Sequence, residues 1–165
     1  AGDAIIGLAS SGLHTNGYSL ARRVFAGWDL AAVVPELGRP LGDVLLAPHR
    51  AYLVEVERLW ATGITIKGLA HITGGGLLDN PPRIFPPGVA GRIRRASWPV
   101  PPIFQLIQRL GQIDEQEMAH VFNLGLGMLV IVSADQADAA LRALAGDAWL
   151  VGEMVAADRG DVQFV

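Results

Sequence analysis

With 165 residues, 51% of them hydrophobic and 18% charged, the chain is long enough for one compact domain with a core and too apolar for an intrinsically disordered segment. A net charge of −3 without a basic stripe argues against a nucleic-acid partner, and the absence of cysteine excludes disulfides, thiolate metal sites and a catalytic thiol. Because no secretory signal opens the chain and its apolar runs are too short to cross a bilayer, we expect a cytoplasmic protein that does not contact membranes.

The first predicted unit is a strand, a loop and a helix. Residues 4–10 form a short apolar run that is typical of a buried strand, and it ends at Ser-Ser-Gly. Asn16 and Gly17 offer a cap for a helix over residues 18–25. A connection rich in proline and glycine follows, and then a second helix that ends before Gly63. Its expected apolar face consists of Leu53, Val56, Leu59 and Trp60.

The second half continues the alternation of strands and helices. A strand over residues 64–72 delivers the chain to a run of glycines, and Pro101 and Pro102 can begin a helix that ends at Gly111. The remaining predicted elements are a helix capped by Asp114 and running to Phe122, a strand over 128–133, a helix capped by Ser133 and Gln136, and a strand over 148–155. This order predicts an α+β protein, a layered α/β sandwich with a mixed sheet covered by helices.

The first loop that could carry chemistry is SSGLHTNGY, residues 10–18. It places hydroxyls, an amide, two glycines and His14 between a strand and the start of a helix, where unpaired backbone N–H groups suit an anion such as phosphate or carboxylate. A tight turn in which Ser and Asn bond to their own backbone explains the same residues equally well. His14 favours the anion site slightly, because its pKa normally lies near neutrality.

The second such loop is HITGGGLLDN, residues 71–80. Three consecutive glycines weaken both helix and strand, which favours close approach of the backbone to a ligand over a flexible hairpin or a helix-packing contact. The segment lacks the lysine of a Walker sequence. We interpret His49 and His120 as merely packed, and the Gly-x-Gly of residues 122–128 as a turn or a close packing contact rather than a binding loop.

Metal ligands are not predicted in this chain. The acidic residues are scattered along helical faces, and Glu55, Glu57, Glu115 and Glu117 look solvated. The residues alone therefore indicate an anion-binding α/β domain.

Four blocks of the sequence resemble the phosphoribosylformylglycinamidine cyclo-ligase family, also called aminoimidazole ribonucleotide synthetase. They occur in the family's order and together span the chain: SSGLHTNGYSL (10–20), GLAHITGGGLLDNPPR (68–83), FNLGLGM (122–128) and VGE (151–153). The family's relatives, which include formylglycinamidine synthetase, selenophosphate synthetase and thiamine-phosphate kinase, share the fold and vary these loops. The resemblance therefore implies that residues 1–165 are the carboxy-terminal domain of such an enzyme, partly ferredoxin-like in fold.

The resemblance implies an ATP-dependent ligase of purine biosynthesis. Formylglycinamidine ribonucleotide would be phosphorylated on its formyl oxygen, and a nitrogen of the amidine side would then close the imidazole and expel phosphate. The amino-terminal half of such an enzyme, expected to be absent from this chain, would hold ATP and Mg²⁺ and form the homodimer. The isolated domain is then expected to be inactive, and the chain that begins at Ala1 would be an excised domain.

The resemblance also implies roles for individual residues. His14 and His71 match histidines at the cleft between the two domains and are expected to be catalytic, with an imidazolium stabilising charge on the transferred phosphoryl group or the formyl oxygen. Substrate or nucleotide phosphate is expected to be bound by Ser10, Ser11, Asn16, Gly74, Gly75, Gly76 and Asn80.

The sequence departs from the family's pattern at four positions. Thr15 stands where serine is commonest, and Leu124 and Leu126 replace methionine and isoleucine. His49 stands where threonine is expected after Pro48, and we assign it no function. Two other functions stay open: another ATP-using relative that resembles formylglycinamidine synthetase, and a non-catalytic binding module.

Overall fold

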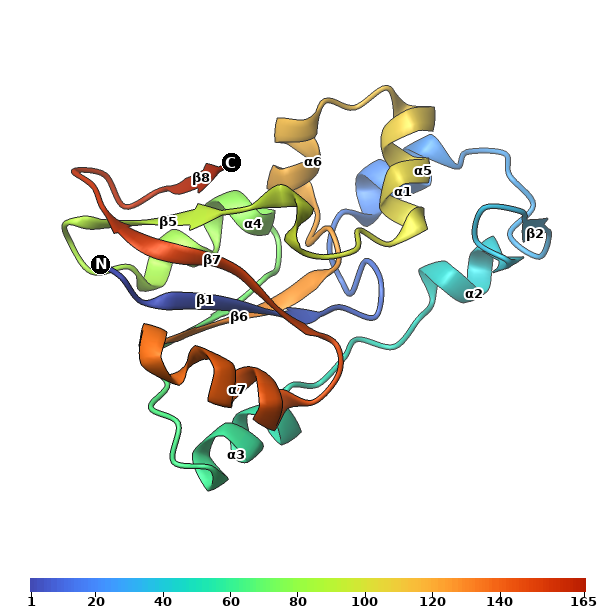
Figure 1. Ribbon diagram of the computed structural model, residues 1–165. Coiled ribbons are helices and arrows are strands. Elements are labelled where there is room, and N and C mark those ends of the chain that lie inside the picture. The colour runs from blue at the N-terminus through green and yellow to red at the C-terminus, as the bar shows by residue number, and fades with distance from the viewer.

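The computed structural model describes residues 1–165, and its centre is a mixed sheet of six strands (Figure 1). The strand order is β4-β6-β1-β7-β5-β8, and every neighbouring pair is antiparallel except β5 and β8, which are parallel. The strands span β1 (Ala4–Ala9), β4 (Gly68–His71), β5 (Val89–Ile93), β6 (Leu126–Val132), β7 (Ala148–Ala156) and β8 (Val162–Phe164). The α+β class with a mixed sheet is therefore confirmed.

Strand β1 lies in the middle of the sheet and is buried on both faces. Ile6 packs with the helices on one face, whereas Ile5 packs in the cluster on the other face. Since neither face meets water, the strand is apolar throughout instead of alternating between apolar and polar residues.

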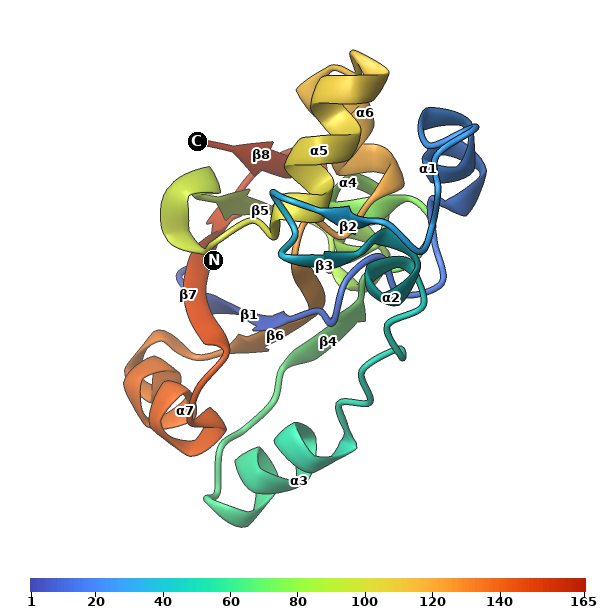
Figure 2. The same ribbon diagram turned by 90° about the vertical axis from the view of Figure 1, so that its right-hand side faces the viewer.

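The part of the sheet formed by β4, β6, β1 and β7 has a ferredoxin-like arrangement. Along the chain it runs β1, α3 (Leu53–Ala61), β4, β6, α7 (Ala137–Leu144) and β7. Helices α3 and α7 contact each other and cover the same face of the sheet (Figures 1 and 2). The predicted resemblance to a ferredoxin-like fold is thus confirmed.

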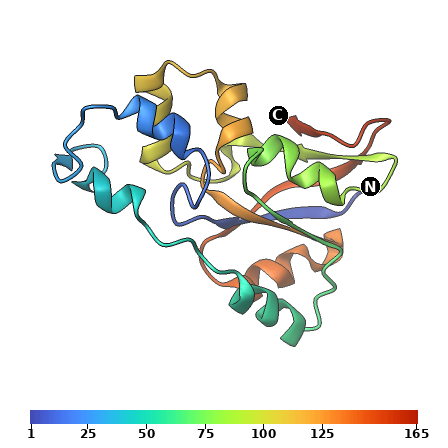
Figure 3. The same cartoon turned by 180° about the vertical axis from the view of Figure 1, so that it is seen from behind.

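A second group of helices lies on the other side of the sheet, as Figure 3 shows from behind. Its core is a cluster of large side chains that includes Leu13, Leu41, Phe104 and Phe122. These helices are α1 (Tyr18–Val24), α2 (Leu41–Leu45), α5 (Pro102–Gly111) and α6 (Glu115–Val121), and the second face of the sheet is covered by α4 (Gly76–Asp79) and the 3₁₀ helix η1 (Pro81–Ile84). No helix in the structure has the length and the apolar composition needed to span a bilayer.

Several predicted boundaries are confirmed by the structure. The Asp114 side chain accepts a hydrogen bond of 2.8 Å from the backbone N–H of Glu117 and so caps α6. Pro102 begins α5, and the first and last long strands lie where the apolar runs predict them. The predicted strand over 64–72 is shorter, because only Gly68–His71 pairs with β6.

Three expectations about individual side chains are wrong. Ser133 makes no capping bond to α7, because a 3₁₀ turn (η3, Ala134–Gln136) precedes the helix and the Gln136 side chain accepts from the N–H of Thr65 instead. Of the two residues predicted to cap α1, Gly17 is the N-cap, in the left-handed conformation, whereas Asn16 is not. Leu53 and Trp60 of α3 are 63% and 61% exposed, so only Val56 and Leu59 of the expected apolar face are buried.

Several short elements lie outside the predicted set, among them β5, α4 and the 3₁₀ turns. Others are α2, the strand β8 at the edge of the sheet, and the hairpin of β2 (Val33–Val34) and β3 (Arg39–Pro40). Each spans five residues or fewer, which is too short for the sequence to show a clear period.

Candidate functional site

The two predicted loops meet at one end of the sheet. Strands β1 and β4 both pair antiparallel with β6, so their carboxyl ends lie together where β6 begins. The loop after β1 and the loop after β4 are adjacent, since a Cβ atom on Gly74 would lie 3.5 Å from Asn16 Oδ1. The sheet topology thereby brings together segments that are 60 residues apart in the sequence.

Three histidine rings form the centre of this end of the molecule. His14 and His49 are stacked, with ring centroids 3.9 Å apart and planes inclined by 19°. Nε2 of His49 lies 3.1 Å from Nε2 of His71. His14 and His71 are brought together as expected, whereas His49, interpreted from the sequence as merely packed, joins them from the loop after α2.

The hydrogen bonds of His14 determine where its proton lies. The backbone N–H of Ser11 is 3.1 Å from Nε2 of His14. A backbone N–H can only donate, so Nε2 is the unprotonated nitrogen and Nδ1 carries the proton of the neutral ring. Nδ1 is buried and has no hydrogen-bond partner. Because an unsatisfied buried donor costs about 1–3 kcal/mol, this N–H is the group in the loop that most needs a partner.

The environment of His14 keeps its ring neutral. Burial, and to a smaller extent the charges of His49, His71 and Arg50, lowers the pKa of His14 to about 4. The pKa of His71 is also lowered, first by burial and then by His49. The lowered pKa of His14 therefore favours its neutral ring at neutral pH, with the proton on Nδ1.

The rings are held by residues around the end of β1. The Tyr52 hydroxyl donates to the carbonyl of Ala9 over 2.8 Å, and Arg50 donates to the same carbonyl over 3.2 Å. Arg50 also pairs with Glu55 at 2.7 Å, and since the Glu55 side chain is only 12% exposed, the prediction that it is solvated is wrong. A Cβ atom on Gly127 would overlap both the Tyr52 hydroxyl and the His14 ring, which explains this glycine as a packing requirement.

The loop after β1 offers a row of free backbone donors. The N–H groups of residues 12–17 donate to no other protein group. The hydroxyls of the two predicted serines are engaged within the protein, because Ser10 donates to Asn123 over 2.9 Å and Ser11 donates to the carbonyl of Pro48 over 2.5 Å. Residues 15–17 are exposed or half-buried, so at these positions the loop presents main-chain N–H groups more readily than serine hydroxyls.

Asn123 organises this loop from the segment before β6. It is 3% exposed, and its amide donates to the carbonyl of Gly12 over 2.9 Å. Its carbonyl oxygen accepts from the hydroxyl of Ser10 and from the N–H of Gly125, at 2.9 and 2.8 Å. Asn123 is thus the residue that connects the third predicted segment to the first loop.

The glycine loop divides into a packing part and an open part. At Gly76 a Cβ atom would overlap the carbonyl oxygen of Ala119 at the end of α6, so this glycine makes a helix-packing contact. Gly74 and Gly75 donate their N–H groups to no other protein group. Asn80, predicted to bind phosphate, is buried and donates to the carbonyl of Gly76 over 2.9 Å, so its amide is used to shape the loop.

Two residues of this site could not be recognised from spacing. His49 lies far from both other histidines in sequence and follows a short helix that the sequence does not reveal. Asn123 stands at the start of the Gly-x-Gly segment, two residues before Gly125, and an asparagine so close to a glycine is the one signal that could indicate a loop-forming role.

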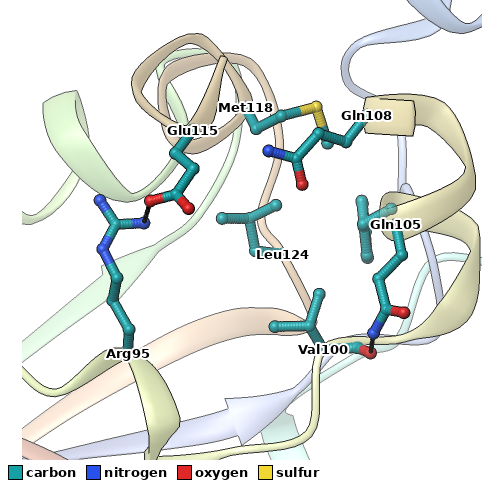
Figure 4. A pocket seen from close by; sticks show the side chains of 8 residues that line it. Arg95, Val100, Gln105, Gln108, Glu115, Met118 and Leu124 are labelled. Atoms are coloured by element: carbon teal, nitrogen blue, oxygen red, sulfur yellow. Dashed lines mark hydrogen bonds and ion pairs between the residues drawn. The ribbon is translucent and has the colours of Figure 1, made fainter. Parts of the chain in front are cut away.

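A separate hollow of about 190 Å³ lies between α5, α6 and the segment before α5 (Figure 4). Arg95 and Glu115 approach within 3.5 Å on one side of it, and Gln105 donates to the carbonyl of Val100 on the other. Arg95, Glu115 and Gln105 are thus already paired, and no histidine lines the hollow. We therefore place the candidate site at the histidines.

Only one group of three or more potential metal ligands is present, namely the three histidines. Mg²⁺ takes oxygen ligands, so these nitrogen atoms do not suit it. No Mg²⁺ site is assigned to this chain.

Comparison with known proteins decides the family. The sequence profile described as "AIR synthase related protein, C-terminal domain" matches residues 1–165. The chain belongs to this family. Among curated relatives, this AIR synthase related domain is 50% identical over 165 residues to the phosphoribosylformylglycinamidine cyclo-ligase of Thermoanaerobacter sp. (strain X514), covering 96% of the chain and 48% of the relative. It is 51% identical to the phosphoribosylformylglycinamidine cyclo-ligase of Symbiobacterium thermophilum, and the match covers 99% of this chain and 49% of the relative.

The AIR synthase related domain thus spans about half the length of the curated relatives that it matches. Among solved structures, it is similar to the hydrogenase maturation protein HypE, with a TM-score of 0.63 and 22% identity over 99% of this chain and 49% of that chain. It is also similar to thiamine monophosphate kinase from Aquifex aeolicus, with a TM-score of 0.57 and 17% identity over 99% of this chain and 50% of the kinase chain. At these identities the two structures support the fold alone.

Proposed function

We propose that this domain supplies half of the active site of an ATP-dependent ligase that closes formylglycinamidine ribonucleotide to aminoimidazole ribonucleotide in purine biosynthesis. ADP and phosphate are the other products. The observation that carries the proposal is the unpartnered Nδ1–H of His14, in a loop after β1 whose residues 12–17 have backbone N–H groups without a protein acceptor. Cyclo-ligases from two bacteria that are 50% and 51% identical to the chain support the choice of reaction.

The proposed reaction needs hydrogen-bond donors more than it needs a base. Before a nitrogen of the amidine side can displace the formyl oxygen, that oxygen becomes a phosphate ester, and phosphate leaves as the ring closes. The donors at the His14 loop would stabilise negative charge on the phosphoryl oxygens and on the formyl oxygen. Free donors at Gly74 and Gly75 lie on the adjacent loop and would hold a substrate phosphate.

His71 has a different role in this proposal from His14. Its ring is exposed and is hydrogen bonded to His49 at Nε2. The His71 ring can therefore contact a substrate that binds to the two loops from the solvent side. We assign it contact with the transferred phosphoryl group, and we assign Ser10, Ser11, Asn16, Gly76 and Asn80 to shaping the two loops around the phosphates.

The other half of the site is proposed to come from an amino-terminal domain. HypE, one of the structural relatives, has been solved in complex with ATP. We propose that ATP and Mg²⁺ are held mainly by that amino-terminal half, since the potential metal ligands of this chain are imidazoles, and that the complete protein is a cytoplasmic homodimer.

Reconstitution tests the proposal. The purified chain alone should form no aminoimidazole ribonucleotide from ATP and formylglycinamidine ribonucleotide. Product should appear when the amino-terminal half of a cyclo-ligase is added, or when that half is fused to the chain in one polypeptide, the joined protein. One ADP should form for each ring closed. Ring closure by the chain alone would contradict the proposal that the active site is shared between this domain and an amino-terminal domain. Turnover of formylglycinamide ribonucleotide with glutamine or ammonia in place of ring closure would indicate a synthetase-like relative, and no turnover of either kind would indicate a binding module.

A further inference from the structure

The three histidines have the composition of a transition-metal site. His14, His49 and His71 each offer one ring nitrogen within 4.8 Å of the other two, and no carboxylate belongs to the group. Neutral imidazole is a preferred ligand of Zn²⁺, Cu²⁺ and Ni²⁺, and three protein ligands with one open position are the usual arrangement of a reactive zinc site. We propose that His14, His49 and His71 bind one divalent transition-metal ion of the Zn²⁺ class.

The distance between His49 and His71 already suits two ligands of one ion. Their Nε2 atoms are 3.1 Å apart. Tetrahedral Zn²⁺ with ordinary Zn–N bonds separates its ligand nitrogens by about 3.3 Å. Without a metal, one of the two Nε2 atoms must carry a proton and donate it to the other. With a metal, the lone pairs of both Nε2 atoms point to the ion, and the proton of each ring lies on Nδ1. Nδ1 of His49 then faces the hydroxyl of Thr15, now 3.4 Å away, which can accept that proton's hydrogen bond.

His14 would provide the third ligand through Nε2, its unprotonated nitrogen. That atom now accepts from the N–H of Ser11, and since Ser11 is exposed, the N–H can bond to water when Nε2 binds the ion. The stacked rings of His14 and His49 are inclined by only 19°, so their in-plane lone pairs do not converge as they stand. The exposed His49 ring must therefore tilt about its Cβ–Cγ bond by an amount that keeps its Nε2 within ligand distance of Nε2 of His71, while the packing of the His14 ring against Gly127 limits the movement of His14.

The fourth coordination position would be accessible. A hollow of about 330 Å³ lies beside the cluster and is lined by His49, His71, Arg50, Tyr52 and Met128 among others. It is roomy enough for a water molecule or a small anionic ligand on the ion. The inference does not depend on the ring-closure proposal, because metal binding is measured with no nucleotide present.

Calorimetric titration of ZnCl₂ into the chain, after treatment with EDTA and its removal, tests this site. We expect one ion per chain with a dissociation constant in the micromolar range or tighter, and Co²⁺ should give the visible absorption of a four-coordinate nitrogen site. H49Q and H71Q should each weaken Zn²⁺ binding by at least about 10-fold. Both rings are exposed, so these variants should fold, which circular dichroism checks. H120Q is the matched control, because His120 lies outside the cluster and faces Asp79 at 3.4 Å.

Wild-type affinity in H49Q would overturn the proposal, and so would a loss in H120Q as large as that in H49Q. Absence of one-to-one binding at micromolar concentrations in the wild-type chain would overturn it as well. None of these outcomes bears on ring closure, which is assayed separately with the joined protein.

Discussion

Replacing His14 or His71 by alanine lowers kcat/KM for ring closure by about 10²- to 10³-fold in the protein joined to its amino-terminal half. The reason is that each ring is expected to donate to an oxygen that gains charge in the transition state. For His14 the donor is Nδ1–H, which has no partner inside the protein. Since the interaction forms with the transition state, most of the loss should appear in kcat rather than in KM.

The control for these two variants is H120A, which changes an exposed histidine on α6 and should keep wild-type kinetics. Equilibrium unfolding of each variant shows whether the fold is retained. If H14A and H71A remain folded and keep kcat/KM within severalfold of the wild-type value, the catalytic assignment fails and a binding module becomes the better account.

The second large effect is a loss of stability on acidification that originates at His14. The pKa of its ring is lowered to about 4 in the folded protein, first by burial and then by His49, His71 and Arg50, against 6.5 as the ordinary value. Because the folded-state pKa lies below the unfolded value, the stabilisation is complete above pH 6.5 and is lost as the pH falls from 6.5 towards 4. Between pH 7.5 and 4.5 this group alone should lower the free energy of unfolding by roughly 2 to 3 kcal/mol.

Urea unfolding of the wild-type chain and of H14Q at these two pH values, in EDTA, measures this difference. The wild-type chain should lose about 2 to 3 kcal/mol more than H14Q over the interval. His71, whose pKa is lowered as well, adds a loss of the same sign to both proteins. H120Q should follow the wild-type curve. Equal pH dependence in H14Q and the wild-type chain would show that His14 is not held neutral by the fold.

The long elements and both loops were predictable because their signals are local. The apolar run of β1, the proline at the start of α5 and the Asp114 cap each determine structure within a few residues. Strand β8 is an example of a short element that forms by pairing with a strand distant in sequence, β5. Nothing in the three residues of β8 requires an extended conformation. The alternation of strands and helices therefore predicted the layers but not the edge of the sheet.

The site was predictable only in part for the same reason. His14 and His71 stand in loops with a recognisable composition, and the sheet brings those loops together. His49 joins the site because its ring stacks on His14, and the spacing of residues in the sequence does not predict such a contact. The lowered pKa of His14 likewise depends on burial by residues distant in sequence, which spacing does not reveal.

The most direct test of the shared site is a nuclear magnetic resonance titration of formylglycinamidine ribonucleotide into the ¹⁵N-labelled chain. The free backbone donors predict amide shift changes concentrated in residues 12–17 and at Gly74 and Gly75, even where binding by the isolated domain is weak. Shift changes centred instead on the hollow between α5 and α6, around Arg95 and Glu115, would contradict the account, as would the absence of any change at millimolar substrate.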